Sequence, residues 1–278
     1  MADPAVRGLH GAATIPGCAA PYASLHWRAD FPAAAASTAD AVTGIIGPDP
    51  GRMPLGICVL HPNFSCGPEL YGWLARSLAL AGWCAVRFSW VAPGIDGTPL
   101  LSTGIDLGRI DDAPNAVLVP LLEALAASVI GPALDRDRVA LVGHSAGGTV
   151  ALLTSHPALR ASVSYGGHVL VPGGRTLRME PGPARLVIGG THDGIVGTLT
   201  GTQGSALAKL QATVAAAPSP AMLCVVDGAD HYAVCEGYDG STGRGHLEAP
   251  GPRPADEVRA EVSELVLAWL AEHAPPSR

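Results

Sequence analysis

From residue 55 onward, short runs of consecutive apolar residues alternate with segments whose apolar residues recur every three or four positions. Continuous apolar runs are typical of strands buried on both faces of a parallel sheet, and apolar residues at every third or fourth position are typical of amphipathic helices. The runs that we expect to form strands are 55–61, 83–90, 138–143, 161–165, 184–189 and 221–226. The segments that we expect to form helices are 69–81, 113–129, 147–155, 205–217 and 255–273.

This alternation predicts an α/β fold with a mostly parallel, doubly wound central sheet and helices on both faces. The pattern is weaker before residue 50, where only 22–28 and 41–46 resemble strands, and we expect residues 1–20 to be irregular. No break in composition, repeat or long linker divides the chain, so we expect one domain over residues 1–278. In such a fold, the loops after the carboxyl ends of the strands carry function.

The composition argues against several classes of protein. Hydrophobic residues make up 48% of the chain, enough for a sizeable core. The net charge is −7 and the 17 basic residues are scattered, so we expect no nucleic-acid partner. The first residues lack a secretory signal pattern, and no apolar run reaches the roughly 18 residues of a membrane span. We therefore expect a cytoplasmic protein with no membrane partner, and the sequence leaves its oligomeric state open.

The six cysteines have no C-x-x-C spacing, which argues against a zinc site or a thioredoxin-like redox motif. Cys58, Cys84 and Cys224 lie in apolar runs and are expected to be small buried hydrophobic residues. Cys66 and Cys235 lie near the candidate catalytic residues described below, and we expect them to be structural as well.

The most informative stretch is residues 143–148, Gly-His-Ser-Ala-Gly-Gly, which directly follows an expected strand. A G-x-S-x-G sequence between a buried strand and a helix is typical of a nucleophile elbow, a sharp turn that exposes the serine. The alternatives are a glycine-rich turn without chemistry and a phosphate-binding loop. The elbow interpretation makes Ser145 the candidate nucleophile, provided that the chain also supplies a base and an acid.

Two residues after later strands can supply the base and the acid. Asp193 follows the run 184–189, and His231 follows the run 221–226, which is the order Ser, acid, His expected for this elbow. Taken singly, Asp193 could be a turn or helix-capping residue and His231 a surface histidine. Asp227 and Asp230 are also candidates for the acid. We rank them second, because residues so close to His231 along the chain would reach its ring at an awkward angle.

An oxyanion hole needs backbone N–H groups beside the nucleophile. The residue after the serine, Ala146, supplies one such group, and the loop of residues 60–67 is expected to supply the other. We favour the amide of Phe64, with Asn63 second, and Pro62 has no N–H to donate. The alternative is an ordinary loop rich in Pro and Gly.

With these residues in place, the chain resembles the α/β-hydrolase superfamily from about Tyr22 to His273. Within it, the spacing is similar to dienelactone hydrolase-related serine esterases, and also to platelet-activating-factor acetylhydrolase-like and polyester hydrolase or cutinase-like enzymes. The matching pieces are residues 61–64, 143–148, 164–167, 189–193 and 227–232. The resemblance implies an α/β-hydrolase fold and a Ser-His-Asp hydrolase.

The chain also departs from these relatives. Dienelactone hydrolases carry a cysteine nucleophile where this chain has Ser145, which weakens the prospect of lactone chemistry. Polyester hydrolases are typically secreted and disulfide-bonded, with an aromatic platform that is missing after Tyr165. The segment 167–183 is short, so we expect no large lid and an open cleft. Phe64, Trp90, Tyr165 and Tyr232 are candidate substrate-binding walls, or else core residues.

These observations predict a serine esterase that cleaves carboxylic esters of small acyl or aryl substrates through an acyl-enzyme. Such a reaction needs no metal and no organic cofactor. The alternatives are an amidase, a thioesterase, a perhydrolase or a polyester hydrolase with the same triad, and a non-catalytic receptor with a hydrolase fold.

Overall fold

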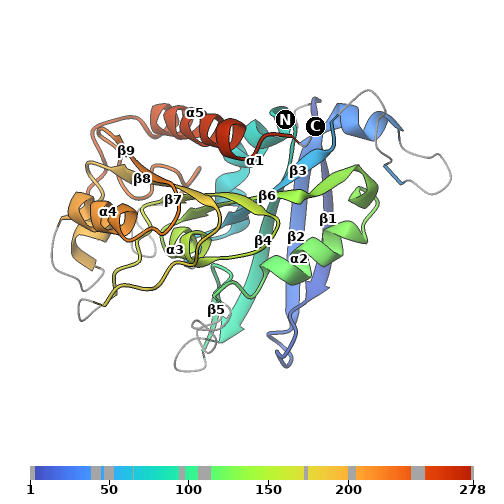
Figure 1. The fold of residues 1–278 in the computed structure, drawn as a ribbon, viewed down its shortest axis with the longest axis horizontal. Coiled ribbons are helices and arrows are strands. Elements are labelled where there is room, and N and C mark those ends of the chain that lie inside the picture. The colour runs from blue at the N-terminus through green and yellow to red at the C-terminus, as the bar shows by residue number, and fades with distance from the viewer. Residues whose placement is uncertain are drawn as a thin grey trace.

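The computed structural model describes residues 4–38, 45–46, 53–64, 66–93, 98–105, 114–171, 175–199, 205–238 and 248–276. In these residues nine strands form one sheet, in the order β1-β2-β4-β3-β6-β7-β8-β9, with β5 paired to β4 (Figure 1). The strands are β1 (Val6–Thr14), β2 (Ser24–Pro32), β3 (Leu55–His61), β4 (Trp83–Pro93), β5 (Pro99–Leu101), β6 (Leu134–His144), β7 (Leu159–Tyr165), β8 (Ala184–Gly190) and β9 (Ala221–Val226).

The sheet is mostly parallel, as the sequence predicts. Every pair from β4 through β3, β6, β7 and β8 to β9 is parallel, whereas β1–β2, β2–β4 and β4–β5 are antiparallel. All seven residues of β3 are buried, which agrees with a strand covered on both faces. Because the parallel strands run in one direction, their carboxyl ends meet at one edge of the sheet.

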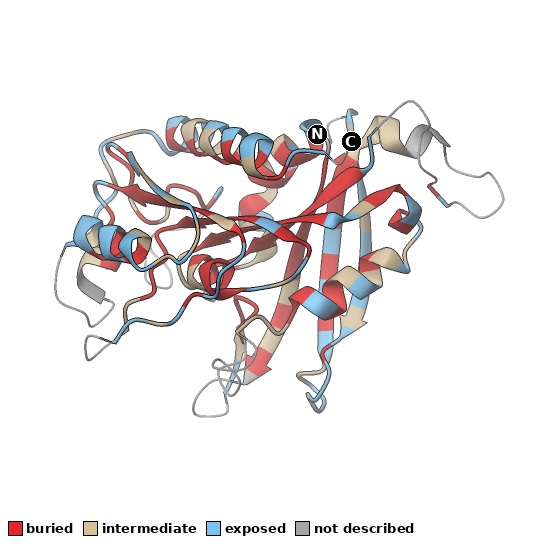
Figure 2. Cartoon of the chain, in the orientation of Figure 1, coloured by how far each residue is buried: buried red, intermediate tan, exposed pale blue. Residues whose placement is uncertain are grey.

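Helices cover both faces of the sheet (Figure 1). α1 and α5 pack on one face with one hydrophobic cluster, and α2, α3 and α4 pack on the other. Figure 2 shows the buried strands between helices whose outer sides are exposed. The helices are α1 (Gly72–Leu80), α2 (Leu118–Ala126), α3 (Ala146–Leu153), α4 (Ala206–Ala215) and α5 (Ala255–His273), with the short 3-10 helices η1 (Ala33–Thr38), η2 (Pro68–Tyr71) and η3 (Gly131–Ala133) and the short π-helix η4 (Ile195–Leu199).

Helix α2 begins later than the apolar spacing predicts. The Asn115 side chain accepts hydrogen bonds from the amides of Val117 and Leu118, at 3.3 and 3.1 Å, and so satisfies two N–H groups at the helix start.

None of the helices that the structure describes has the length and apolar character needed to cross a bilayer.

The prediction that residues 1–20 are irregular is wrong, because β1 lies within them and pairs antiparallel with β2 over its full length. β1 contains few large apolar side chains, so its sequence carries a weak signal, and its order comes from backbone pairing. Gly11 allows the Trp27 ring to lie against the strand, since a Cβ at Gly11 would lie 2.5 Å from that ring. Most of the other weak pattern, 41–46, lies outside the described residues.

The segment between β7 and β8 contains no helix in its described part, which agrees with the prediction that no large lid is built there. Leu170 and Thr176 form an isolated bridge in this segment. The edge of the sheet above Ser145 is therefore not covered by a helical excursion from the described residues of this segment.

Candidate active site

Ser145 occupies a sharp turn between β6 and α3. Its φ is 56° and its ψ −121°, and it is the one non-glycine residue with positive φ in the described chain. This strained backbone is sterically unfavourable for a side chain with a Cβ and is typical of functional turns. A Cβ at Gly143 would lie 2.1 Å from the carbonyl oxygen of Gly147, so glycine is required where the strand turns into the helix. The geometry is that of the predicted nucleophile elbow.

The loop after β3 lies directly against this elbow. A Cβ at Gly147 would meet the carbonyl oxygens of Pro62 and His61 at 2.3 and 2.5 Å. The Asn63 amide donates to the Tyr71 hydroxyl, at 3.0 Å, and is therefore occupied. The amides of Phe64 and Ala146 donate no hydrogen bond to another described residue. These two amides are therefore available to an oxyanion, whereas that of Asn63 is not.

Asp193 and His231 form a buried pair at the same edge. His231 Nδ1 lies 2.9 Å from Asp193 Oδ2, and both side chains are fully buried. The other carboxylate oxygen of Asp193 accepts a hydrogen bond from the Val196 amide, at 2.9 Å, which fixes the carboxylate in its orientation. The second ring nitrogen of His231, Nε2, has no hydrogen-bond partner among the described residues. His231 can therefore hold a proton toward Asp193 while Nε2 accepts another one.

The geometry of the site explains why the motif Ser-Tyr-Gly-Gly at 164–167 contains two glycines. Gly166 has a φ of 61°, and a Cβ there would lie 2.9 Å from both Asp193 Oδ2 and His231 Nδ1. Its neighbour Gly167 would place a Cβ 2.6 Å from the carbonyl oxygen of Ser145. These two glycines allow the end of β7 to fit between the elbow and the Asp193–His231 pair.

The two other candidate acids are engaged elsewhere. Asp230 accepts hydrogen bonds from the amides of Tyr232 and Gly251, at 2.9 and 2.7 Å. Asp227 accepts one from the Thr191 hydroxyl, at 3.0 Å. Among the described residues the His231 ring is hydrogen-bonded to Asp193 and not to Asp227 or Asp230, which agrees with the ranking of Asp193 above both.

A buried network connects the loop after β3, the elbow and the loop that carries His231. His144 Nδ1 lies 2.9 Å from the Tyr71 hydroxyl and 3.5 Å from Cys235 Sγ. Burial holds the pKa of His144 well below its ordinary value, and the positive charge that His231 can carry lowers it further. His144 is therefore a neutral residue beside the candidate base, and Cys235 is a buried part of the same packing.

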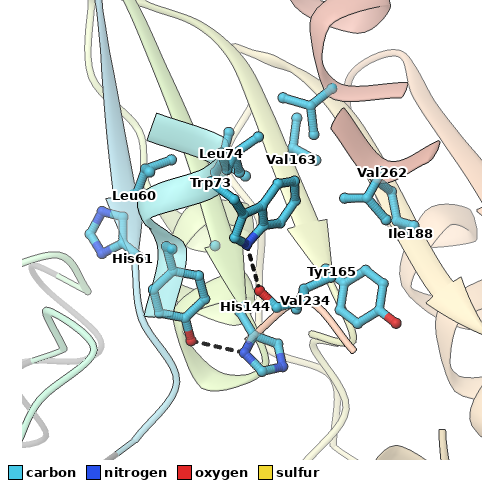
Figure 3. A pocket seen from close by; sticks show the side chains of 14 residues that line it. Leu60, His61, Trp73, Leu74, His144, Val163, Tyr165, Ile188, Val234 and Val262 are labelled. Carbon is cyan, nitrogen blue, oxygen red and sulfur yellow. Dashed lines mark hydrogen bonds between the residues drawn. The ribbon is translucent and has the colours of Figure 1, made fainter. Parts of the chain in front are cut away.

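A small cavity of about 20 Å³ lies beneath the elbow, between the sheet and the helices α1 and α5 (Figure 3). Apolar side chains of the strands and both helices line it, together with His144 and Tyr165. A cavity of this volume has room for about one water molecule and for no organic substrate.

Of the four aromatic residues that the sequence offers as substrate-binding walls, Trp90 is a core residue. Its side chain is 1% exposed, packs in the cluster on the α2 face, and donates a hydrogen bond from Nε1 to the Tyr22 carbonyl at 2.8 Å. Tyr165 is also buried, with its hydroxyl donating to the Asp230 carbonyl at 2.6 Å. The sequence pattern could not distinguish substrate-binding residues from core residues here, because aromatic side chains near strand ends occur in both.

Tyr232 lies next to the candidate base. Its ring is half-buried and meets the His231 ring edge-to-face, with 5.2 Å between the ring centres. It also stacks on Tyr238 with 4.3 Å between centres. Tyr232 is thus partly exposed beside His231, unlike the buried Trp90 and Tyr165.

One residue of this site is missing from the sequence-based prediction. Glu248 accepts hydrogen bonds from the amides of Gly194 and Ile195 with one carboxylate oxygen, at 2.7 and 3.3 Å. Its other oxygen accepts from the amide of His231, at 3.0 Å. The sequence shows Glu248 only in a loop rich in Gly and Pro with no motif, so no pattern pointed to it.

The expected states of the cysteines agree in part with the structure. Cys58, Cys84 and Cys66 are buried free thiols, whereas Cys224 is only partly buried on β9. Burial raises the pKa of Cys84 to about 12, which keeps this thiol protonated and unreactive. Among the described residues, no three His, Cys, Asp or Glu side chains lie close enough together to hold a metal ion.

No protein-family model and no curated protein matches the sequence, but many solved structures match its fold. A ferulic acid esterase from Streptomyces cinnamoneus is 17% identical, with a TM-score of 0.61, 98% of this chain and 91% of that chain covered. A serine hydrolase without a lid from Xanthomonas campestris is 16% identical, with a TM-score of 0.54 and 97% of both chains covered. The chain has the α/β-hydrolase fold.

Other α/β hydrolases of similar structure include a dienelactone hydrolase-like promiscuous phosphotriesterase from metagenomic libraries. It is 18% identical to this chain, with a TM-score of 0.58, 97% of this chain and 99% of that chain covered. The predicted resemblance to dienelactone hydrolase-like proteins is confirmed at the level of the fold. These structural neighbours are hydrolases, and within this fold the chemistry depends on the residues of the individual site.

Proposed function

We propose that this protein is a serine hydrolase that cleaves carboxylic esters of small acyl or aryl substrates. The observation that carries the proposal is the fully buried Asp193–His231 pair, with Nε2 unpartnered among the described residues, beside the strained turn of Ser145. The His231 ring lies 4.7 Å, centre to centre, from the ring of His144, the residue before the serine. The esterase among the structural neighbours agrees with an ester as substrate.

In the first step His231 Nε2 takes the hydroxyl proton of Ser145 while Ser145 Oγ attacks the ester carbonyl carbon. The amides of Ala146 and Phe64 donate hydrogen bonds to the oxyanion that forms. His231 then gives the proton to the leaving alcohol, and an acyl-enzyme remains. Asp193 holds the ring in the tautomer that leaves Nε2 free to accept, and its charge stabilises the imidazolium.

In the second step a water molecule takes the place of the alcohol. His231 removes a proton from this water, the oxygen attacks the acyl carbonyl carbon, and the proton returns to Ser145 Oγ as the carboxylic acid leaves. The same oxyanion donors act in both steps. The protein side chains therefore supply every proton transfer that the reaction needs.

The test is labelling of the purified protein with a fluorophosphonate probe, followed by mass spectrometry of the labelled peptide. We expect the probe on Ser145, no labelling in S145A, and hydrolysis of p-nitrophenyl acetate with an initial burst of p-nitrophenol. A native protein that does not react with the probe would contradict the proposal of a serine nucleophile. Labelling without hydrolysis of any aryl ester would contradict the ester substrate and direct the search to amides, thioesters or a receptor role.

A further inference from the structure

Glu248 connects the two loops that carry the Asp193–His231 pair. Its carboxylate accepts the amides of Gly194 and Ile195, which directly follow the acid, and the amide of His231 itself. Because these partners are backbone groups, Glu248 does not compete with Asp193 for the ring nitrogen Nδ1. The side chain therefore fixes the positions of acid and base relative to each other without touching the reacting atoms.

The surroundings of Glu248 contain several ionisable groups. Asp193 and His231 face it from the loops after β8 and β9, and Tyr165 and Tyr232 lie within electrostatic range. Burial, together with the negative charge of Asp193, raises the pKa of Glu248 to about 7, against the opposing effects of His231 and the amide donors. A carboxyl group beside the base thus changes its charge near neutral pH.

We propose that Glu248 is a positioning residue of the active site, a second carboxylate that holds the loops of Asp193 and His231 together and supports the positive charge on His231. This inference rests on the proposed function for its catalytic consequence. The charge on the imidazolium appears when His231 takes the proton of Ser145, and a negative Glu248 nearby lowers the energy of that state. Protonation of Glu248 removes this support and weakens the hydrogen bonds from the three amides.

The first test follows the His231 ring by NMR as a function of pH, in the native protein and in E248Q, with the ring signals assigned by their absence in H231Q. The new amide side chain keeps an oxygen for the amides of Gly194 and Ile195 but presents no negative charge to His231. We expect the midpoint of the His231 titration to fall by roughly one pH unit in E248Q. E236Q is the matched control, because it removes one exposed negative charge from the loop that carries His231 and should leave the midpoint unchanged.

The native protein gives a second readout that does not depend on any variant folding. Because the pKa of Glu248 is raised to about 7 and its carboxylate accepts the amide of His231, we expect the native titration of the His231 ring to follow two coupled steps. A single-site curve in the native protein, or an unchanged midpoint in E248Q, would overturn the proposal. This readout needs no enzymatic turnover, so it distinguishes a failure of the Glu248 proposal from a failure of the proposed esterase function.

Activity measurements separate a positioning role from a merely structural one. We expect the acid limb of the kcat/KM profile for p-nitrophenyl acetate to move to lower pH in E248Q, and its plateau to fall by roughly tenfold. E248D keeps the charge on a shorter side chain, so its acid limb should stay at the native pH while its plateau falls. A lower plateau with an unmoved acid limb in E248Q would mean that Glu248 only stabilises the fold.

Discussion

The ring of His144 lies 4.7 Å, centre to centre, from the ring of His231, so the residue before the candidate nucleophile packs directly on the candidate base. Burial and the charge that His231 can carry hold the pKa of His144 well below its ordinary value. A neutral His144 adds no second positive charge when His231 is protonated. Its Nδ1 is held by the Tyr71 hydroxyl, which also accepts the amide of Asn63 in the loop after β3.

Replacement of Tyr71 by Phe should therefore disturb both the fold and the oxyanion loop. Y71F leaves the amide of Asn63 and His144 Nδ1 buried without this partner, and we expect the free energy of unfolding to fall by about 1–3 kcal/mol. We also expect kcat for p-nitrophenyl acetate to fall more than KM rises, because the neighbouring Phe64 amide acts mainly on the transition state. Urea unfolding and steady-state kinetics measure the two effects, and a native-like kcat would contradict the second one.

Replacement of Gly166 by Ala should displace the Asp193–His231 pair. The new Cβ would meet Asp193 Oδ2 and His231 Nδ1 at 2.9 Å, and we expect kcat/KM to fall by at least about 100-fold. The matched control is G17A, because Gly17 also has a positive φ, of 80°, with open space within 4 Å of a Cβ. G17A should lose about 1 kcal/mol of stability and keep its activity. Equal losses of activity in the two variants would show that backbone strain alone accounts for the effect.

Replacement of Asp193 by Asn should leave the fold intact and remove most of the activity. An asparagine at this position cannot fix the His231 tautomer in the same way, and losses of roughly 10⁴-fold in kcat are typical of such changes in Ser-His-Asp triads. D230N should instead weaken the hydrogen bonds from the amides of Tyr232 and Gly251 and mainly lower the thermal unfolding temperature. If D230N loses more activity than D193N, the acid has been misassigned.

The two aromatic residues Tyr232 and Trp90 should respond differently to substitution. Y232A removes a half-buried ring beside His231, and we expect KM for aryl esters to rise about 2- to 10-fold, as the loss of one aromatic contact implies. W90F removes a buried hydrogen bond to the Tyr22 carbonyl and should lower the free energy of unfolding by roughly 1–3 kcal/mol with KM unchanged. A changed substrate preference in W90F would mean that Trp90 reaches the cleft after all.

The pH dependence of stability should report on Glu248 independently of activity. The folded-state pKa of Glu248 is raised to about 7, above its value in the unfolded chain, so the folded protein binds the extra proton between these two values. The contribution of Glu248 to stability is therefore present at low pH and is lost as the pH rises through about 7. We expect the thermal unfolding temperature of E248Q, measured relative to the native protein, to increase from about pH 5 to about pH 8. A constant difference would contradict the raised pKa.

Much of the fold could be predicted from the sequence, because burial on both faces leaves continuous apolar strands that are easy to recognise. The run 55–61 coincides with β3, and the segment 255–273 coincides with α5. β1 was not predicted, because its order depends on backbone pairing with β2. A strand with mostly small side chains has no strong hydrophobic pattern of its own. Local sequence is informative where side-chain burial decides the structure, and much less so where backbone pairing does.

The sequence by itself determined the candidates Ser145, Asp193 and His231, because each follows an apolar strand and their order along the chain is that of a nucleophile elbow with its partners. Only the tertiary structure decided which acid faces the His231 ring, that the amide of Asn63 is already occupied, and that Trp90 is a core residue. Only the tertiary structure shows that the Glu248 carboxylate accepts a hydrogen bond from the amide of His231. These relationships join residues that are distant in the chain, and their contacts depend on how the loops pack rather than on local sequence patterns.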